Sequence, residues 1–170
     1  MKSESARVTT AEEARFRVSY PNSTPRAVKV IALDRKAEAV VKRLLQLPWN
    51  GASFFTASAF AAAPDQGASF SMTGWLADLA GLAKNLLDEV DTADLVVMVA
   101  TAGENAQAAS IIGEACSLKR VMTTALIVGG ANASDEVLSK TLSHLRPWAL
   151  MLVIANADDY IEDMLIALRA

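Results

Sequence analysis

The stretch VVMVATAGENAQAASIIGEA, from Val96 to Ala115, decides the fold. It predicts an apolar strand, a short turn that contains Gly103, and a helix with apolar residues at helical spacing. Strand, turn and helix in this order form the unit from which parallel α/β sheets are built. Because such a turn often holds a nucleotide phosphate at the helix N-terminus, the stretch also raises the question of a ligand.

Similar units occupy the rest of the chain. Apolar strands are predicted to begin near Val28, Ala52, Leu95, Thr123 and Ala149. After the second strand, residues 75–90 predict one long helix, because its apolar residues recur on one face. Strands that are apolar almost throughout are buried on both faces, which is typical of a parallel sheet covered by helices. We therefore expect a three-layer, doubly wound α/β fold with a mainly parallel sheet of about five strands.

The chain of 170 residues has the length of one domain. Residues 1–26 are mostly polar and predict a tail, and residues 27–170 predict a single α/β domain. The N-terminus has neither a secretory signal nor a lipidation motif, so we expect a cytoplasmic protein.

Composition excludes several kinds of site. One cysteine, Cys116, excludes an intrachain disulfide and a multi-cysteine metal site, and one histidine, His144, argues against a histidine-based centre. We expect Cys116 to pack as a small apolar group and His144 to lie at the surface. Basic residues do not cluster with aromatic ones, so nucleic acid is not an expected partner. No complete catalytic motif is present, which favours a protein that is not an enzyme.

Charge is unevenly distributed. Residues 1–43 carry a net charge of +5, and the remainder carries −8. Between Leu44 and Ala77 the single charged residue is Asp65, but Pro and Gly interrupt the segment, so it is not a membrane span. Its loop ends in three large apolar residues that predict an interface with a second copy or another protein: Phe70, Met72 and Trp75. The alternative is a loop folded over its own sheet edge.

Several strings resemble the nucleotide-binding domain of the FtsZ/tubulin family. They are ADLVVMVATAG (Ala93 to Gly103), TTALIV (Thr123 to Val128) and ALMLVIANADDYIEDML (Ala149 to Leu165). The first resembles the family's strand that leads into its phosphate loop, and the resemblance covers residues 27–168. It implies an α/β nucleotide-binding topology.

The glycines of the family's phosphate loops are absent. The first turn, ALDRKAE, has no glycine, and the second, TAGENAQAAS, keeps only Gly103. Backbone N–H groups close on phosphate oxygens where no Cβ atom intervenes. Acidic residues also stand at the predicted helix starts, where they cap the helix and repel an anion: Asp34, Glu104, Asp135, Glu136, Asp158 and Asp159. We therefore expect neither GTP hydrolysis nor tight GTP binding.

Two functions follow from these patterns. The first is a non-catalytic, FtsZ/tubulin-like binding or assembly module with a degenerate nucleotide site and no cofactor. The alternative is an enzyme or sensor that binds a small molecule, a nucleotide or Mg²⁺ at the carboxyl ends of the strands. In the alternative the site would be lined by Asp34, Thr101, Gly103, Asn105, Gly130, Asn156 and Asp158.

Overall fold

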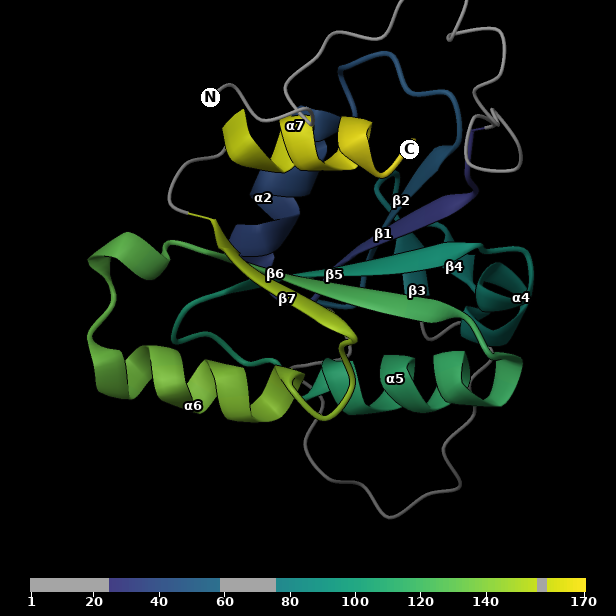
Figure 1. The fold of residues 1–170 in the computed structure, drawn as a ribbon. Coiled ribbons are helices and arrows are strands. Elements are labelled where there is room, and N and C mark those ends of the chain that lie inside the picture. The colour runs from purple at the N-terminus through teal and green to yellow at the C-terminus, as the bar shows by residue number, and fades with distance from the viewer. Residues whose placement is uncertain (1–24, 59–75, 156–158) are drawn as a thin grey trace, which may run out of the picture.

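The computed structural model describes residues 25–58, 76–155 and 159–170. In this part of the chain seven strands form one sheet, in the order β4-β3-β2-β1-β5-β6-β7 (Figure 1). The strands are β1 Val28–Ala32, β2 Ala52–Thr56, β3 Leu76–Asp78, β4 Ala83–Lys84, β5 Leu95–Thr101, β6 Met122–Val128 and β7 Met151–Ala155. The helices are α2 Arg35–Leu44, α4 Leu86–Asp91, α5 Ala108–Lys119, α6 Asp135–Leu145 and α7 Asp159–Ala167, with a 3₁₀ turn η2 at Gly130–Asn132.

Five of the strands are parallel and correspond to the five that the sequence predicts. They are β2, β1, β5, β6 and β7, and each is paired in parallel with its neighbour. β1, β2 and β5 begin where predicted, β6 begins one residue early, and β7 begins at Met151, two residues late. The predicted α/β fold with a mainly parallel sheet is confirmed.

Helices cover both faces of the sheet, which gives three layers (Figure 1). Alternate residues of β5 point to opposite faces, as the two-residue period of a strand requires. Val96 and Met98 pack into the cluster beneath α4, α5 and α6. Val97 and Val99 pack into the cluster beneath α2 and α7. The central strand is thus buried on both sides, which is why its sequence is apolar throughout.

The predicted helix over residues 75–90 is wrong. This segment forms the short antiparallel pair β3 and β4, and a helix starts only at Leu86. Gly81 takes a left-handed φ of +88° between the two strands. The Asp78 carboxylate accepts hydrogen bonds from the backbone N–H groups of Ala80 (3.0 Å) and Leu82 (2.9 Å), which stabilises the turn. Helical spacing of leucines was misleading because Leu76 and Leu86 reach the same core from two separate elements.

Some sequence-based expectations concern residues outside the described part of the chain. These are the tail up to residue 24, the proposed interface residues Phe70, Met72 and Trp75, and the candidate ligand residues Asn156 and Asp158. They stay predictions.

Candidate functional site

The direction of the chain across the sheet reverses between β1 and β5. From β1 the chain proceeds to β2 on one side, and from β5 it proceeds to β6 and β7 on the other. In doubly wound folds ligands bind in the crevice that opens at this reversal, outside the carboxyl ends of the strands. The candidate residues Asp34 and Thr101 follow β1 and end β5, so they lie at this position.

Asp34 is committed to contacts within the protein. Its side chain is 6% exposed, and Oδ1 accepts a hydrogen bond from the N–H of Ala37 (2.8 Å), which caps α2. The Thr101 hydroxyl donates to Oδ1 (2.9 Å) and the Thr101 N–H donates to Oδ2 (2.7 Å). Both carboxylate oxygens are therefore occupied, and the carboxylate joins the ends of β1 and β5 instead of facing an open crevice.

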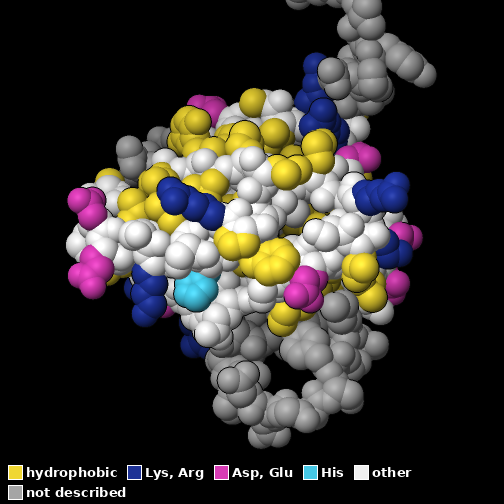
Figure 2. Space-filling model, turned by 60° about the horizontal axis from the view of Figure 1, so that its bottom comes forward, with side chains coloured by type: hydrophobic (Ala, Val, Ile, Leu, Met, Phe, Trp, Pro, Cys, Tyr) yellow, Lys and Arg dark blue, Asp and Glu magenta, His cyan; other side chains and the backbone are white. Residues whose placement is uncertain are grey.

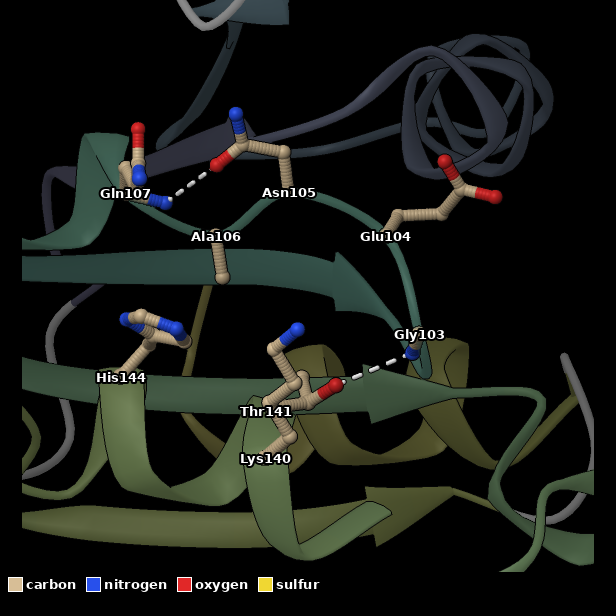
Figure 3. Close-up of a pocket in the computed structure, with 8 residues that line it drawn as sticks. All are labelled: Gly103, Glu104, Asn105, Ala106, Gln107, Lys140, Thr141 and His144. Carbon is tan, nitrogen blue, oxygen red and sulfur yellow. Dashed lines mark hydrogen bonds between the residues drawn. The ribbon is translucent and has the colours of Figure 1, made fainter. Parts of the chain in front are cut away.

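The turn after β5 also directs its backbone inwards. The N–H of Gly103 donates to the hydroxyl of Thr141 on α6 (3.0 Å), and the N–H of Gln107 donates to the Asn105 side chain (2.9 Å; Figure 3). The N–H of Glu104 donates to the carbonyl of Thr101 (3.0 Å). A phosphate loop needs such N–H groups to point at the ligand. Here these three are bound to other atoms of the chain.

Both candidate glycines make room for neighbouring side chains. A Cβ atom added to Gly103 would lie 2.9 Å from Cγ1 of Val137, and one added to Gly130 would lie 2.4 Å from Cγ2 of Ile154. Gly103 also needs its left-handed φ of +86°. These glycines are thus explained by packing and turn geometry.

Glu104 binds a cation of the same chain. Its carboxylate lies 2.6 Å from the Lys36 ammonium, which connects the turn to α2. The hydrogen bond to Glu104, together with its charge, raises the pKa of Lys36 above the ordinary lysine value. The prediction that Glu104 caps the helix after β5 is wrong, since α5 starts at Ala108 with no side-chain cap and no acidic residue in its first turn. At α6 the predicted acids Asp135 and Glu136 do lie in the first turn, and the cap itself is Ser134, whose side chain accepts from the N–H of Val137.

A cavity of about 270 Å³ lies between this turn and α6. Figure 3 shows Lys140 and His144 pointing from α6 towards the turn, while Glu104 points away from them. The cavity is lined by Gly103, Glu104, Asn105, Ala106, Gln107, Lys140, Thr141 and His144. Two of the candidate residues, Gly103 and Asn105, therefore face a real cavity. Its α6 wall carries the Lys140 ammonium and the His144 ring, and the turn contributes the Glu104 carboxylate.

Sequence reasoning missed the α6 wall of this cavity. Lys140 and His144 are four residues apart, so the helical spacing alone places them on one side of α6. What they face depends on the order of the strands, which puts α6 beside the turn after β5. His144 is exposed, as expected, although it lines the cavity.

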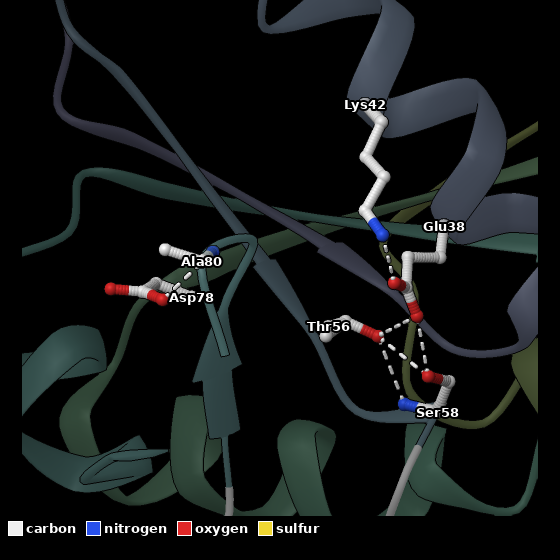
Figure 4. A network of polar contacts seen from close by, with 6 residues as sticks. All are labelled: Glu38, Lys42, Thr56, Ser58, Asp78 and Ala80. Atoms are coloured by element: carbon white, nitrogen blue, oxygen red, sulfur yellow. Dashed lines mark hydrogen bonds and ion pairs between the residues drawn. The ribbon is translucent and has the colours of Figure 1, made fainter. Parts of the chain in front are cut away.

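A second polar cluster lies where β2 ends beside α2 (Figure 4). The hydroxyls of Ser58 (2.7 Å) and Thr56 (3.1 Å) donate to Oε2 of Glu38, and Lys42 lies 2.7 Å from Oε1. Lys42, followed by Ser58, lowers the pKa of Glu38. A carboxylate held in its ionised form is a weak base, so this arrangement does not activate Ser58 as a nucleophile.

Across the described residues, no group of three or more His, Cys, Asp and Glu side chains is arranged to hold a metal ion. In the same part of the chain, every buried side-chain nitrogen and oxygen atom has a hydrogen-bond partner. Buried polar groups without partners often mark a site that awaits a ligand. Neither cluster offers such a group.

Comparison with known proteins adds little to this picture. No family model matches the sequence, and no curated protein matches it. Among solved structures, the chain is similar to translation elongation factor SelB from Methanococcus maripaludis, in complex with the GTP analogue GppNHp (TM-score 0.48) and in the apo form (0.47), each at 12% identity. The similarity covers 84% and 85% of this chain but only 33% and 36% of those chains, so this chain spans about a third of their length.

Among the described helices, none has the length and apolar character needed to cross a membrane.

Proposed function

We propose that this chain is a non-catalytic binding or assembly module, with an FtsZ/tubulin-like α/β topology and a degenerate nucleotide site. The observation that carries the proposal is the carboxylate of Asp34 at the chain reversal between β1 and β5. It is buried, and both of its oxygens are hydrogen-bonded. A negative charge fixed there repels the phosphate that the site of a working nucleotide-binding protein attracts.

Three further features support this proposal. The N–H groups of Gly103 and Gln107 are bound internally. The side chains of Val137 and Ile154 occupy the space beside Gly103 and Gly130, the two glycines of the candidate site. The Ser58 hydroxyl is paired with a carboxylate whose pKa is lowered. Each feature stabilises the fold and leaves no group prepared for catalysis in this part of the chain.

The experiment is a titration with labelled GTP and Mg²⁺, beside a measurement of mass in solution. We expect no binding at micromolar nucleotide and no hydrolysis, together with self-association. GTP binding at micromolar or tighter affinity, lost when the turn from Gly103 to Gln107 is altered, would overturn the proposal. A chain that stays monomeric at high micromolar concentration would remove the assembly part of it.

A second candidate function is the binding of a small anion in the cavity beside α6. It is favoured by Lys140 and His144, whose side chains face the cavity together with the amide of Gln107. A thermal-shift series with small carboxylates, phosphate and nucleotides tests it. An anion at 100 times its dissociation constant adds about 2.7 kcal/mol to the free energy of unfolding. The shift should disappear in Lys140→Met and persist in the control Lys119→Met, whose lysine pairs with Asp91 on the other side of α5.

A further inference from the structure

The two edges of the described sheet are protected differently. At one edge β4 has two residues, Ala83 and Lys84, and a short strand with a lysine is a usual defence against edge-to-edge pairing. At the other edge β7 has five residues, MLVIA, and pairs only with β6 among the described strands. No charged residue occurs from Pro147 to Ala155. This edge lacks the charge, proline or bulge that blocks pairing.

Backbone groups on the outer side of β7 are available for hydrogen bonds. N–H and C=O groups alternate in direction from residue to residue along a strand. The carbonyl of Val128 accepts from Ala102 on the β5 side, so the backbone groups of Ile127 face β7. The parallel register of β6 and β7 then turns the groups of Leu152 and Ile154 away from β6. Large apolar side chains accompany them: Leu150 is 79% exposed, Met151 40% and Ile154 39%. Such an edge is a template for another strand.

We infer that β7 pairs with β7 of a second copy of this chain, antiparallel about a two-fold axis at Leu152, so that the two sheets become continuous. This inference rests on the proposed assembly role. The axis places Leu152 opposite Leu152 of the other copy, and the outward N–H and C=O groups of the two residues then form a hydrogen-bonded pair. It also places the exposed Leu150 opposite Ile154 of the other copy, on the face that α6 covers.

The charges of α6 favour a second copy as the partner. Acidic side chains, Asp135 and Glu136, stand in its first turn, and Arg146 follows its last residue. Lys140 lines the cavity on the side of α6 that faces α5. Helical spacing places Asp135 and Arg146 on the other side of α6, together with Leu142. Figure 2 shows acidic groups at the left edge of the molecule, and hydrophobic side chains dispersed among polar and charged ones.

Two-fold symmetry makes this surface complementary to itself. When β7 strands are antiparallel, the α6 helices are antiparallel too, and the acidic start of one comes beside the basic end of the other. A stable interface typically buries about 800 Å² per partner. A strand edge of five residues is too short to supply this area alone. The α6 helices would supply the remaining contact area and fix the direction of pairing.

The first test replaces Leu150 with lysine and measures mass over a range of concentrations. The wild type should approach twice the chain mass of 18.0 kDa. Leu150→Lys should raise the dissociation constant at least tenfold without loss of helical circular dichroism. The matched control is Leu118→Lys, at a leucine of α5 that is 74% exposed and lies away from β7, and it should leave the dissociation constant unchanged. Charge reversal of Arg146 to Asp should weaken the dimer, and adding Asp135→Arg should restore it.

A second test uses Leu152→Cys under a mild oxidant. Directly opposite residues in a hydrogen-bonded antiparallel pair have Cα atoms about 5.5 Å apart, within the range of a disulfide. Leu152→Cys should form a covalent dimer, and Val153→Cys, displaced from the axis, should form far less. A wild-type dimer that is indifferent to Leu150→Lys but dissociated by Phe70→Glu would overturn the inference and leave the assembly proposal standing. A wild-type monomer would overturn both.

Discussion

The side chain of Asp34 is bound to Thr101 through two hydrogen bonds, one from the Thr101 N–H (2.7 Å) and one from its hydroxyl (2.9 Å). The two residues are separated by 67 positions in the sequence and stand at the ends of neighbouring parallel strands. The same carboxylate caps α2 through the N–H of Ala37. One side chain thereby fixes a helix start and closes the position where doubly wound proteins bind ligands.

Asp34→Ala should destabilise the protein strongly. Loss of the cap and of the partner of two Thr101 groups should lower the free energy of unfolding by about 2–4 kcal/mol. The matched control is Asp135→Ala, which removes an exposed first-turn carboxylate from α6 and should cost about 0.3–1 kcal/mol. Urea unfolding followed by circular dichroism measures both. Equal costs in the two variants would contradict the role given to Asp34.

Gly113→Ala should destabilise the protein although it introduces a better helix former. In an exposed helix the change is favourable by about 1 kcal/mol. In α5 the new Cβ atom would lie 2.6 Å from Cβ and Cε3 of Trp148, and overpacking costs about 1–3 kcal/mol. We expect a lower melting temperature in Gly113→Ala and no loss in the control Ser139→Ala, at an exposed position of α6. A more stable Gly113→Ala protein would refute the tight contact between α5 and Trp148.

Gly130→Ala should destabilise the protein through Ile154. The new Cβ atom would lie 2.4 Å from Cγ2 of Ile154, a methyl group on a branched Cβ whose χ1 rotation is restricted. In an Ile154→Ala background the same change should cost much less, so the two substitutions should be non-additive in a double-mutant cycle. Additive free energies of unfolding would show that Gly130 has another role, such as close approach of a ligand.

The Glu38 cluster should contribute to stability in a pH-dependent way. Because Lys42 and Ser58 lower the pKa of Glu38 in the folded protein, its contribution is complete above the ordinary glutamate pKa. It is lost as the pH falls through the lowered value. Glu38→Gln should therefore lose less stability in acid than the wild type. Lys42→Gln keeps the hydrogen bond from Ser58 to Glu38, so its loss of stability in acid should be intermediate. Identical acid unfolding curves for all three would contradict this account.

Cys116 should react slowly with thiol reagents in the folded protein. It is 1% exposed, and burial raises its pKa to about 12, so almost no thiolate is present at mildly alkaline pH. Reaction with a chromogenic disulfide should be slow in native buffer and fast in denaturant. Rapid native reaction would indicate that α5 opens readily.

Much of the fold was determined by local sequence. The strands at Val28, Leu95 and Met122 are recognisable because both of their faces are buried, so most of their residues are apolar. The cap at Asp34 could also be predicted, since a helix start needs an acceptor for its free N–H groups and the side chain that provides it is a near neighbour in sequence.

Tertiary structure decided the rest. The segment from Leu76 to Val90 has leucines at helical spacing, yet the turn at Asp78 and Gly81 and the free edge of β2 make strands of its first half. The cavity between the turn after β5 and α6 joins Gly103 to Lys140 and His144, which meet only because β6 carries α6 to that side. The bond from Asp34 to Thr101 likewise needs β1 and β5 to be neighbours. Strand order is a property of the whole sheet, so no local pattern in the sequence specifies which side chains it brings together.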